Sequence, residues 1–266
     1  MASVNNFIID HVLRGIMLST ADGSYMWSIN QITEPALNIT SETAEAVDAL
    51  GSRIATFNRG KSAEFSANNS IFDLGLFAAQ NGVEKLEASA ASKIQAPMFE
   101  EFEVATGDLT HVLAETPTDD IEKVYKLNGD GTLGNVYETA AAASSSKFGW
   151  DSTSKTLTYP TSTGAPEPGT RFIVIYDYMC ENGSAVIADA VNFPKAGRFI
   201  LEVLGTDVCD PTTLIHAYLD FPNAKLDANV DITFATDGNH PFTIQCQQAY
   251  CDAQKVLYKL IVPKED

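Results

Sequence analysis

The sequence predicts a mainly β protein: a β-sandwich or partly closed barrel with one flanking α-helix at about residues 70–81 and long loops. First, short segments of alternating apolar and polar residues recur along the 266-residue chain, separated by turns rich in Gly, Pro, Asn and Asp. Second, only one segment combines the composition and the end signals of a strong helix. A chain of this length can form one large β domain with a core of ordinary size.

The N-terminal part predicts strands with a long interruption. Residues 6–32 hold two apolar runs on either side of an ADGS turn at 21–24. Residues 33–52 are acidic and contain Pro35, so we expect a long loop with room for one helical turn at 41–50. The alternation resumes at residues 53–65, with a bend or bulge near Gly60. Residues 25–65 are therefore expected to form a β-hairpin with an unusually long acidic tip.

The next segment changes period and predicts the helix. Ser70 stands where an N-cap belongs, and Gly82 stands at the C-terminal stop. Nearly every residue between them is apolar, which is typical of a helix buried on all sides. We expect this helix to brace the sheet through Ile71, Leu74 and Phe77.

The remainder of the chain predicts further short strands. Residues 99–104, 109–115, 121–127 and 155–159 have this pattern, interrupted by an exposed AAAASSSK stretch at 140–147. The C-terminal third is richer in strands, with turns at Asn182-Gly183 and Pro222-Asn223. Its predicted strands are residues 172–179, 185–190, 199–205, 214–221, 230–235, 242–247 and 256–262.

Composition and charge exclude several classes of protein. The chain has 35 acidic and 17 basic residues, a net charge of -18, without a basic cluster, so we expect no nucleic-acid binding. No apolar run is long enough to span a membrane, so no membrane insertion is expected. The N-terminus lacks the basic and apolar regions of a secretory signal, which predicts synthesis in the cytoplasm. Four cysteines are too few for a disulfide scaffold.

Two motifs resemble ligand-binding loops but lack required residues. Gly60-Lys61-Ser62 ends like a P-loop, yet Ala55 occupies the upstream glycine position and the order of strand, loop and helix is wrong. The NGDGT stretch at 128–132 starts like a calcium loop, but its later glycine and glutamate positions hold other residues. We therefore interpret the first as a strand lysine and the second as a plain turn.

Cysteine and histidine spacing predicts no catalytic centre. Cys246 and Cys251, with His240 nearby, allow a zinc site or a disulfide on paper, but buried thiols are the preferred interpretation. The histidines are scattered, and no pair of carboxylates stands out among the 35 acids. We expect no enzyme activity, no catalytic residues, no cofactor and no metal.

Two stretches carry a resemblance to a known family. They are DALGSRIATFNRGKSAEFSANNSIFDLGLFAAQNG at 48–82 and FPNAKLDANVDITFATDGNHPFTI at 221–244. Together with the order of hairpin, strand, helix and β-rich remainder, they resemble the major tail tube proteins of tailed, long-tailed (siphophage-like) bacteriophages. The resemblance implies a single tail-tube domain over residues 1–266, with an elaboration at about 106–169.

The resemblance also implies a structural function. Such subunits form homohexameric rings that stack into a hollow tube, together with tape-measure, tail terminator and baseplate proteins. DNA passes through the lumen during ejection into the host without specific binding, and an acidic wall would let it slide. The protein would be made late in infection in the host cytoplasm and would reside in the tail of the virion.

Five carboxylates are candidates for roles in such a tube. If the segments at about 25–33 and 53–65 line the lumen, Glu34 and Glu64 are expected to face it. Glu42, Glu45 and Asp48 are expected in the loop that reaches the next ring. For each of them, an ordinary solvated surface carboxylate remains the alternative.

Two other functions remain open from the sequence. One is another phage structural protein of related fold: a tail terminator, a baseplate hub or a head-decoration protein. The other is a carbohydrate-binding β-sandwich, which would need Tyr25, Trp27, Trp150 and Tyr159 to gather into one aromatic platform.

Overall fold

The structure is a computed structural model that describes residues 6–236, 238–248 and 254–263. It consists mainly of strands with one α-helix, which confirms the predicted mainly β class. The chain divides into two compact units. The first unit comprises Met1–Lys85 and Val186–Asp266, and the second comprises Leu86–Ala185. No helix among the described residues has both the length and the apolar character needed to cross a membrane.

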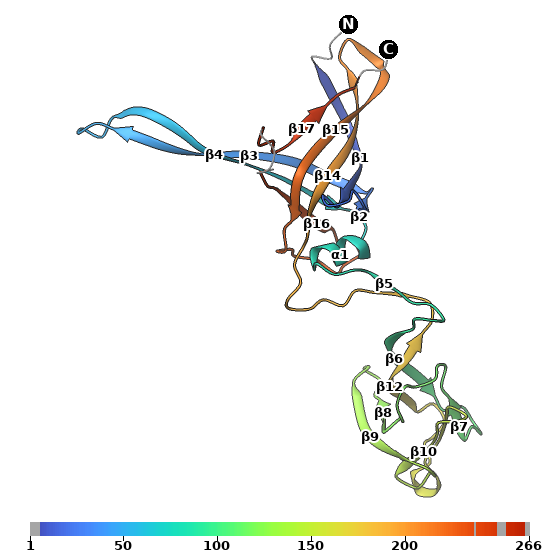
Figure 1. Cartoon of the computed structure of the whole chain (residues 1–266). Coiled ribbons are helices and arrows are strands. Elements are labelled where there is room, and N and C mark those ends of the chain that lie inside the picture. Colours follow the sequence, from blue (N-terminus) through green and yellow to red (C-terminus); the bar gives the residue numbers. More distant parts are fainter. Residues whose placement is uncertain (1–5, 237, 249–253, 264–266) are drawn as a thin grey trace. The chain divides into compact units, whose positions relative to one another are not determined.

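The first unit is built on one eight-stranded antiparallel sheet (Figure 1). Its order is β2-β1-β14-β15-β16-β4-β3, with β17 pairing to β15. The predicted N-terminal hairpin is confirmed, because β1 and β2 pair around the 21–24 turn. The strands are β1 (Phe7–Leu18), β2 (Tyr25–Ile29), β3 (Ile32–Val47), β4 (Arg53–Asn69), β14 (Ala196–Asp207), β15 (Asp210–Leu226), β16 (His240–Cys246) and β17 (Lys259–Ile261).

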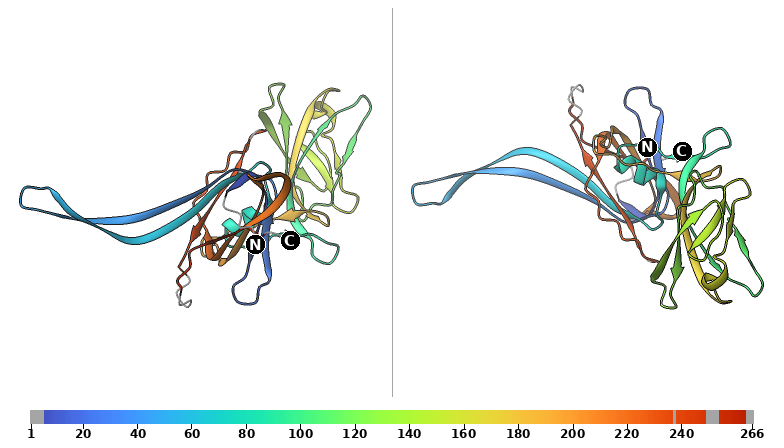
Figure 2. Two further views of the ribbon diagram at one scale, coloured as in Figure 1. Left: turned by 90° about the horizontal axis from the view of Figure 1, so that it is seen from above. Right: turned by 90° about the horizontal axis from the view of Figure 1, so that it is seen from below.

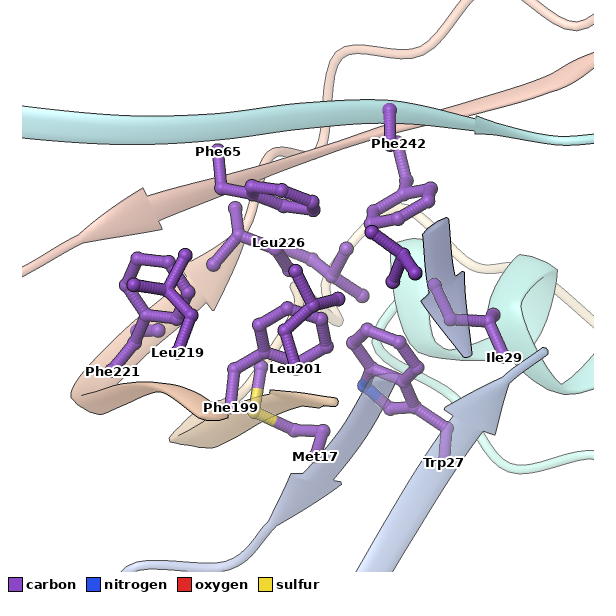
Figure 3. Close-up of a cluster of buried hydrophobic side chains, with 14 of the residues drawn as sticks. Met17, Trp27, Ile29, Phe65, Phe199, Leu201, Leu219, Phe221, Leu226 and Phe242 are labelled. Carbon is purple, nitrogen blue, oxygen red and sulfur yellow. The ribbon is translucent and has the colours of Figure 1, made fainter. Parts of the chain in front are cut away.

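Aromatic side chains fill the core of this unit (Figure 3). Phe199 lies at its centre, with its ring centroid 5.6 Å from that of Trp27 and 6.1 Å from that of Phe65. Gly15 on β1 is required here, because a Cβ at that position would lie 2.7 Å from the Phe199 ring. Alternate residues of each strand therefore supply the core, as the period of two predicts.

The expected loop at 33–52 is instead a strand, and that prediction is wrong. β3 pairs with β4 along its whole length, from Ile32 opposite Asn69 to Val47 opposite Arg53. Pro35 is tolerated because β3 is the edge strand of the sheet and the register shifts between Thr33 and Ala36. The predicted pairing of 25–33 with 53–65 is also wrong, since β2 pairs with β1.

The helix is shorter and more exposed than the sequence predicts. α1 spans Leu74–Gln80, and its N-cap is Asp73 rather than Ser70. The Asp73 carboxylate accepts a hydrogen bond from the Leu76 N–H at 2.7 Å, which satisfies an otherwise unpaired donor of the first turn. Gly82 ends the helix as predicted, with φ of 72°, and its N–H donates to the Ala79 carbonyl.

The expected burial of α1 on nearly all sides is also wrong. Leu76 and Ala78 are buried, whereas Ile71 and Leu74 are exposed and Phe77 is half-buried. α1 packs against β2, and its buried Gln80 bonds to His240 and Pro241 of β16, whereas Leu74 points away from these contacts. Ile71 precedes the helix altogether.

The second unit holds a seven-stranded sheet of order β6-β12-β8-β9-β10-β11-β7 around its own core. Phe148 and Phe172 pack edge to face within it, with centroids 5.2 Å apart. Residues 106–169 lie wholly inside this unit. Its elements are β5 (Leu86–Glu87), β6 (Ile94–Glu103), β7 (Thr110–Val112), β8 (Lys123–Leu127), β9 (Leu133–Ala140), β10 (Lys147–Asp151), β11 (Thr156–Thr158), the 3-10 helix Ser162–Gly164, β12 (Arg171–Cys180) and β13 (Ser184–Ala185).

Most strands predicted in the C-terminal third are present, with two exceptions. Residues 230–235 form no strand, and of residues 185–190 only Ala185 belongs to one. Both segments have β-branched or aromatic residues but no hydrogen-bonding partner strand in the described chain, and propensity alone does not form a strand.

Candidate assembly surface

The most distinctive feature of the first unit is the β3–β4 hairpin, here called the arm (Figures 1 and 2). It extends far beyond the strands that cover the core. Its turn is fixed locally by Asp48, whose Oδ1 accepts hydrogen bonds from the N–H groups of Leu50 and Ser52 at 2.9 and 2.8 Å. Gly51 supplies the positive φ, 81°, that this turn requires.

The base of the arm belongs to the core. Paired residues on neighbouring strands share a face of the sheet. Leu37 pairs with Phe65 and Ile39 with Ala63, and this face packs against the core. The opposite face of the base is polar, with Asn38 opposite Glu64 and Thr40 opposite Ser62.

Beyond Gly60 the apolar residues lie on the opposite face. Gly60 is an extra residue in β4, because Ser41 pairs with Lys61 and the next residue, Glu42, pairs with Arg59. Its φ of 59° is the left-handed conformation in which glycine carries no steric cost. The bulge thus confirms the predicted irregularity near Gly60.

The distal half of the arm therefore has an apolar surface directed away from the face that packs on the core. Ala44 pairs with Phe57 and Ala46 with Ala55, on the same face as the polar Asn38–Glu64 pair. We call Ala44, Ala46, Ala55 and Phe57 the distal face. The Phe57 side chain is 55% exposed, so nothing in the described part of the subunit covers it.

The other side of the distal half carries polar strand pairs, followed by the exposed Val47 two residues beyond Glu45. Thr43 pairs with Asn58 and Glu45 with Thr56 there, and the Arg53 guanidinium lies 2.5 Å from the Glu45 carboxylate. At the end of the arm, Leu50 is 92% exposed. Exposed apolar side chains gathered at the end of a hairpin are typical of a surface that binds another molecule.

The five candidate carboxylates all lie on the arm. Glu34 and Glu64 lie at its base, and Glu34 accepts a hydrogen bond from the Asn68 side chain at 2.8 Å. Glu42 lies opposite Arg59, Glu45 pairs with Arg53, and Asp48 caps the turn. The structure thus gives Asp48 a local structural role that the sequence did not suggest. Their places in an assembly remain predictions.

A second apolar surface lies just before α1. Phe72 stacks on Phe234 with centroids 5.7 Å apart, and on the His240 ring at 5.0 Å with an interplanar angle of 16°. Phe234 is 82% exposed. A groove of about 500 Å³ opens beside these rings, lined by Phe72, Thr233, Phe234, Ala235, Thr236, Gly238 and Asn239. We call it the aromatic groove.

His240 holds the back of this groove in place. Its Nδ1 accepts from the Asp73 N–H at 3.3 Å, so Nε2 carries the proton and donates to the Gln80 Oε1 at 2.8 Å. Gln80 in turn donates to the Pro241 carbonyl at 2.9 Å. Burial lowers the pKa of His240, with a smaller opposing effect from Asp73, which favours the neutral ring that these bonds need. Sequence reasoning missed this groove, because the stacking of Phe72 on Phe234 joins residues far apart in the chain.

The profile of the YomU/Tube protein family matches residues 7–256. The chain belongs to the YomU/Tube protein family. The family indicates a phage tube-type structural protein, a virion component. No curated protein sequence matches the chain. The matched range spans residues of both compact units.

The sheet of this tube-family protein has ion pairs on the face opposite the core. Glu202 on β14 pairs with Arg14 on β1 at 2.5 Å and with the His216 ring on β15 at 2.9 Å. Burial alone would raise the pKa of Glu202, but the hydrogen bonds from Arg14 and His216 outweigh it and lower the pKa. Asp220 binds Arg198 in the same way, through two hydrogen bonds. These cross-strand pairs fasten β1, β14 and β15 together.

One polar cluster of the second unit has the residue types of an active site, but its groups satisfy one another. The Glu100 carboxylate accepts from the Tyr176 hydroxyl at 2.6 Å and the Ala114 N–H at 3.1 Å, and the His111 Nε2 lies 2.8 Å away. Burial and the Glu100 bond raise the pKa of Tyr176. His111 also stacks on Phe102 at 4.0 Å. The cluster ties the segment after β7 to β6 and β12, which is a structural role.

The motifs rejected from the sequence lie in ordinary structure. Gly60-Lys61-Ser62 lies in β4 at the bulge, and the 128–132 stretch is a turn in which Asp130 accepts from Thr132 at 2.6 Å. Within residues 6–236, 238–248 and 254–263, no group of three or more His, Cys, Asp or Glu residues could hold a metal ion. Cys251, one member of the sequence's zinc or disulfide alternative, lies outside the described residues.

The carbohydrate-binding alternative loses its aromatic platform. Trp27 and Tyr159 are core residues, and Trp150 donates to the Asp120 carboxylate at 3.0 Å. Of the four, Tyr25 alone is exposed, and Trp150 is partly buried. Buried rings cannot stack on a sugar, so these four residues cannot form the platform.

Proposed function

We propose that the chain is the subunit of a phage tail tube, in which homohexameric rings stack into a hollow tube that conducts DNA. Membership in the YomU/Tube family over residues 7–256 carries this proposal. Its finer parts, the hexamer, the stacking and the DNA passage, extend beyond the family name. The protein would catalyse no reaction and would function as a polymer.

The edges of the first unit's sheet support ring formation. The sheet ends in β2 on one side and β3 on the other, and β3 carries a free edge along its 16 residues. Such edges are prone to uncontrolled pairing unless a partner covers them. Pairing the β3 edge of one subunit with a neighbour's edge would cover it and close a ring.

The charge of the chain supports an acidic wall. The net charge is -18, and Glu34 and Glu64 lie at the base of the arm, with Glu64 on its polar face. Carboxylates repel phosphates, so DNA would slide past them without binding. We propose that Glu34 and Glu64 face the lumen, and that Glu42, Glu45 and Asp48 lie where the arm reaches the next ring. Tape-measure, terminator and baseplate proteins would be its partners in the virion tail.

The second unit is proposed to be an elaboration on the tube subunit. It has its own core and sheet, and it contains 15 acidic and 6 basic residues. A unit with its own core can decorate a polymer without altering the subunit that polymerises.

Negative-stain electron microscopy of the purified, concentrated protein tests the proposal. We expect long rods with a stain-filled lumen and sixfold end views. Rings that never stack would instead support a tail terminator or baseplate hub. Monomers at all concentrations would refute a self-assembling tube subunit.

A further inference from the structure

We propose that the distal face of the arm docks in the aromatic groove of a second copy of the chain. The proposal rests on the proposed tube function and names the two surfaces that join its copies. Both surfaces present exposed aromatic side chains, and both belong to the first unit. Phe57 would enter the groove beside Phe72 and Phe234.

The register of the arm directs the distal face away from the core of its own subunit. Phe57 and Phe65 are eight residues apart on β4, so an uninterrupted strand would place both on the core face. The extra Gly60 moves Phe57 to the other face, and on β3 the apolar positions change in step from Leu37 and Ile39 to Ala44 and Ala46. Because the apolar positions move to the opposite face on both strands, Ala44 and Phe57 remain paired there. This apolar pair is then available to a partner outside the subunit.

The aromatic groove has the size and the rigidity of an acceptor. Its volume of about 500 Å³ can hold a phenylalanine ring together with neighbouring alanine methyl groups. Phe72 is fixed from behind by stacking on His240, which is itself held by Gln80. A preformed wall lowers the entropic cost of binding.

The two surfaces cannot meet within one subunit. In Figures 1 and 2 the end of the arm lies far from α1, and Phe72 directly precedes the N-cap of α1. The distal face and the aromatic groove are different surfaces, so a contact between them is head-to-tail. Head-to-tail contacts repeat, and they generate rings or open helical polymers.

One charge close to Phe57 is complementary to charges close to the groove of a second copy. The arm carries Arg53, Arg59 and Lys61, three of the five basic residues in the first 85 positions, within a chain of net charge -18. Arg59 lies on the same face as Phe57, while Asp73 and Asp231 are close in sequence to groove residues. The arm also carries five carboxylates, so the complementarity is local, between Arg59 beside Phe57 and the acidic residues beside the groove.

Cross-linking between two variants tests the docking directly. Phe57→Cys and Phe234→Cys are made in separate chains, which are mixed, assembled and oxidised. We expect a cross-linked dimer on a non-reducing gel from the mixture, and none from oxidised wild type or from either variant alone. Rods of the mixed variants without the cross-link would overturn the docking and leave the tube function standing.

Assembly of polar variants gives a second, independent measurement. Phe57→Asn and Phe234→Asn are each expected to raise the concentration needed for rods about tenfold or more, as loss of a central aromatic anchor does. The matched control is Phe99→Asn, because Phe99 is a comparably exposed strand residue, 66%, in the second unit. It should change that concentration less than about twofold. Equal effects of Phe57→Asn and Phe99→Asn would overturn the docking, whereas a wild type that forms no rods refutes the tube function itself.

Discussion

The two halves of the arm use the same pair of strands for opposite purposes. At the base, Phe65 and Leu37 complete the core of their own subunit. Beyond Gly60, Phe57 and Ala44 form an apolar pair on the other face, without cover from the described part of the subunit. The difference shows that one inserted residue can move the apolar side chains of a strand from the core face to the opposite face, because side chains alternate with a period of two.

The largest expected difference between the two halves of the arm is in the free energy of unfolding. Phe65→Ala should lower the free energy of unfolding by about 3–5 kcal/mol, because it leaves a cavity among packed aromatic rings. Phe57→Ala, eight residues away on the same strand, should cost less than about 0.5 kcal/mol in the unassembled subunit. Denaturant titration measures both. Similar losses would mean that the two halves do not differ as described.

Removing ion pairs from the sheet and from the arm should lower the free energy of unfolding by different, smaller amounts. Glu202→Gln should cost about 1–3 kcal/mol, since Arg14 and His216 would lose a buried carboxylate. Glu45→Gln removes the exposed pair with Arg53 and should cost about 0–1 kcal/mol.

The pH dependence of Glu202 has a definite sign. Its pKa is lower in the folded protein than the ordinary value of 4.5. Its contribution to stability is therefore present above pH 4.5 and is lost as the pH falls below it, because the unfolded chain binds the proton more readily. The wild type should lose stability more steeply than Glu202→Gln in acid denaturation curves. Parallel curves would contradict this assignment.

The next prediction concerns the bulge itself. Gly60→Val should cost about 1–2 kcal/mol, because its φ of 59° is unfavourable for a β-branched residue while no atom crowds the position. Gly129→Val is the matched control, since Gly129 is equally open and lacks a positive φ. Thermal unfolding compares the two. A larger loss for Gly129→Val would argue against strain at the bulge.

Local signals predicted local features well. The turn at 21–24, the irregularity at Gly60 and the helix end at Gly82 are all confirmed. Each depends on residues close in sequence, whose backbone preferences are intrinsic. The sequence predicts the N-cap three residues too early, because Ser70 and Asp73 are both competent caps and only packing selects between them.

Features that need a distant partner were missed. Residues 33–52 contain Pro35 and many acids, which is typical of a loop, yet Ile32–Val47 is a strand because β4 pairs with all of it. Residues 230–235 have strand composition and no pairing strand, so they form none. The distal face could have been suspected from the change of parity between Leu37 and Ala44, but only the pairing with β4 shows that both strands change together.

By itself the sequence determined the mainly β class, the position of the single helix, the acidic charge and the likeness to tube proteins. These follow from composition, side-chain periodicity and short motifs. The tertiary structure alone decided which strands pair, where the arm lies, which face of it is apolar and how Phe72, Phe234 and His240 meet. The physical reason is that strand pairing and ring stacking join residues far apart in the chain, and their register depends on the whole sheet.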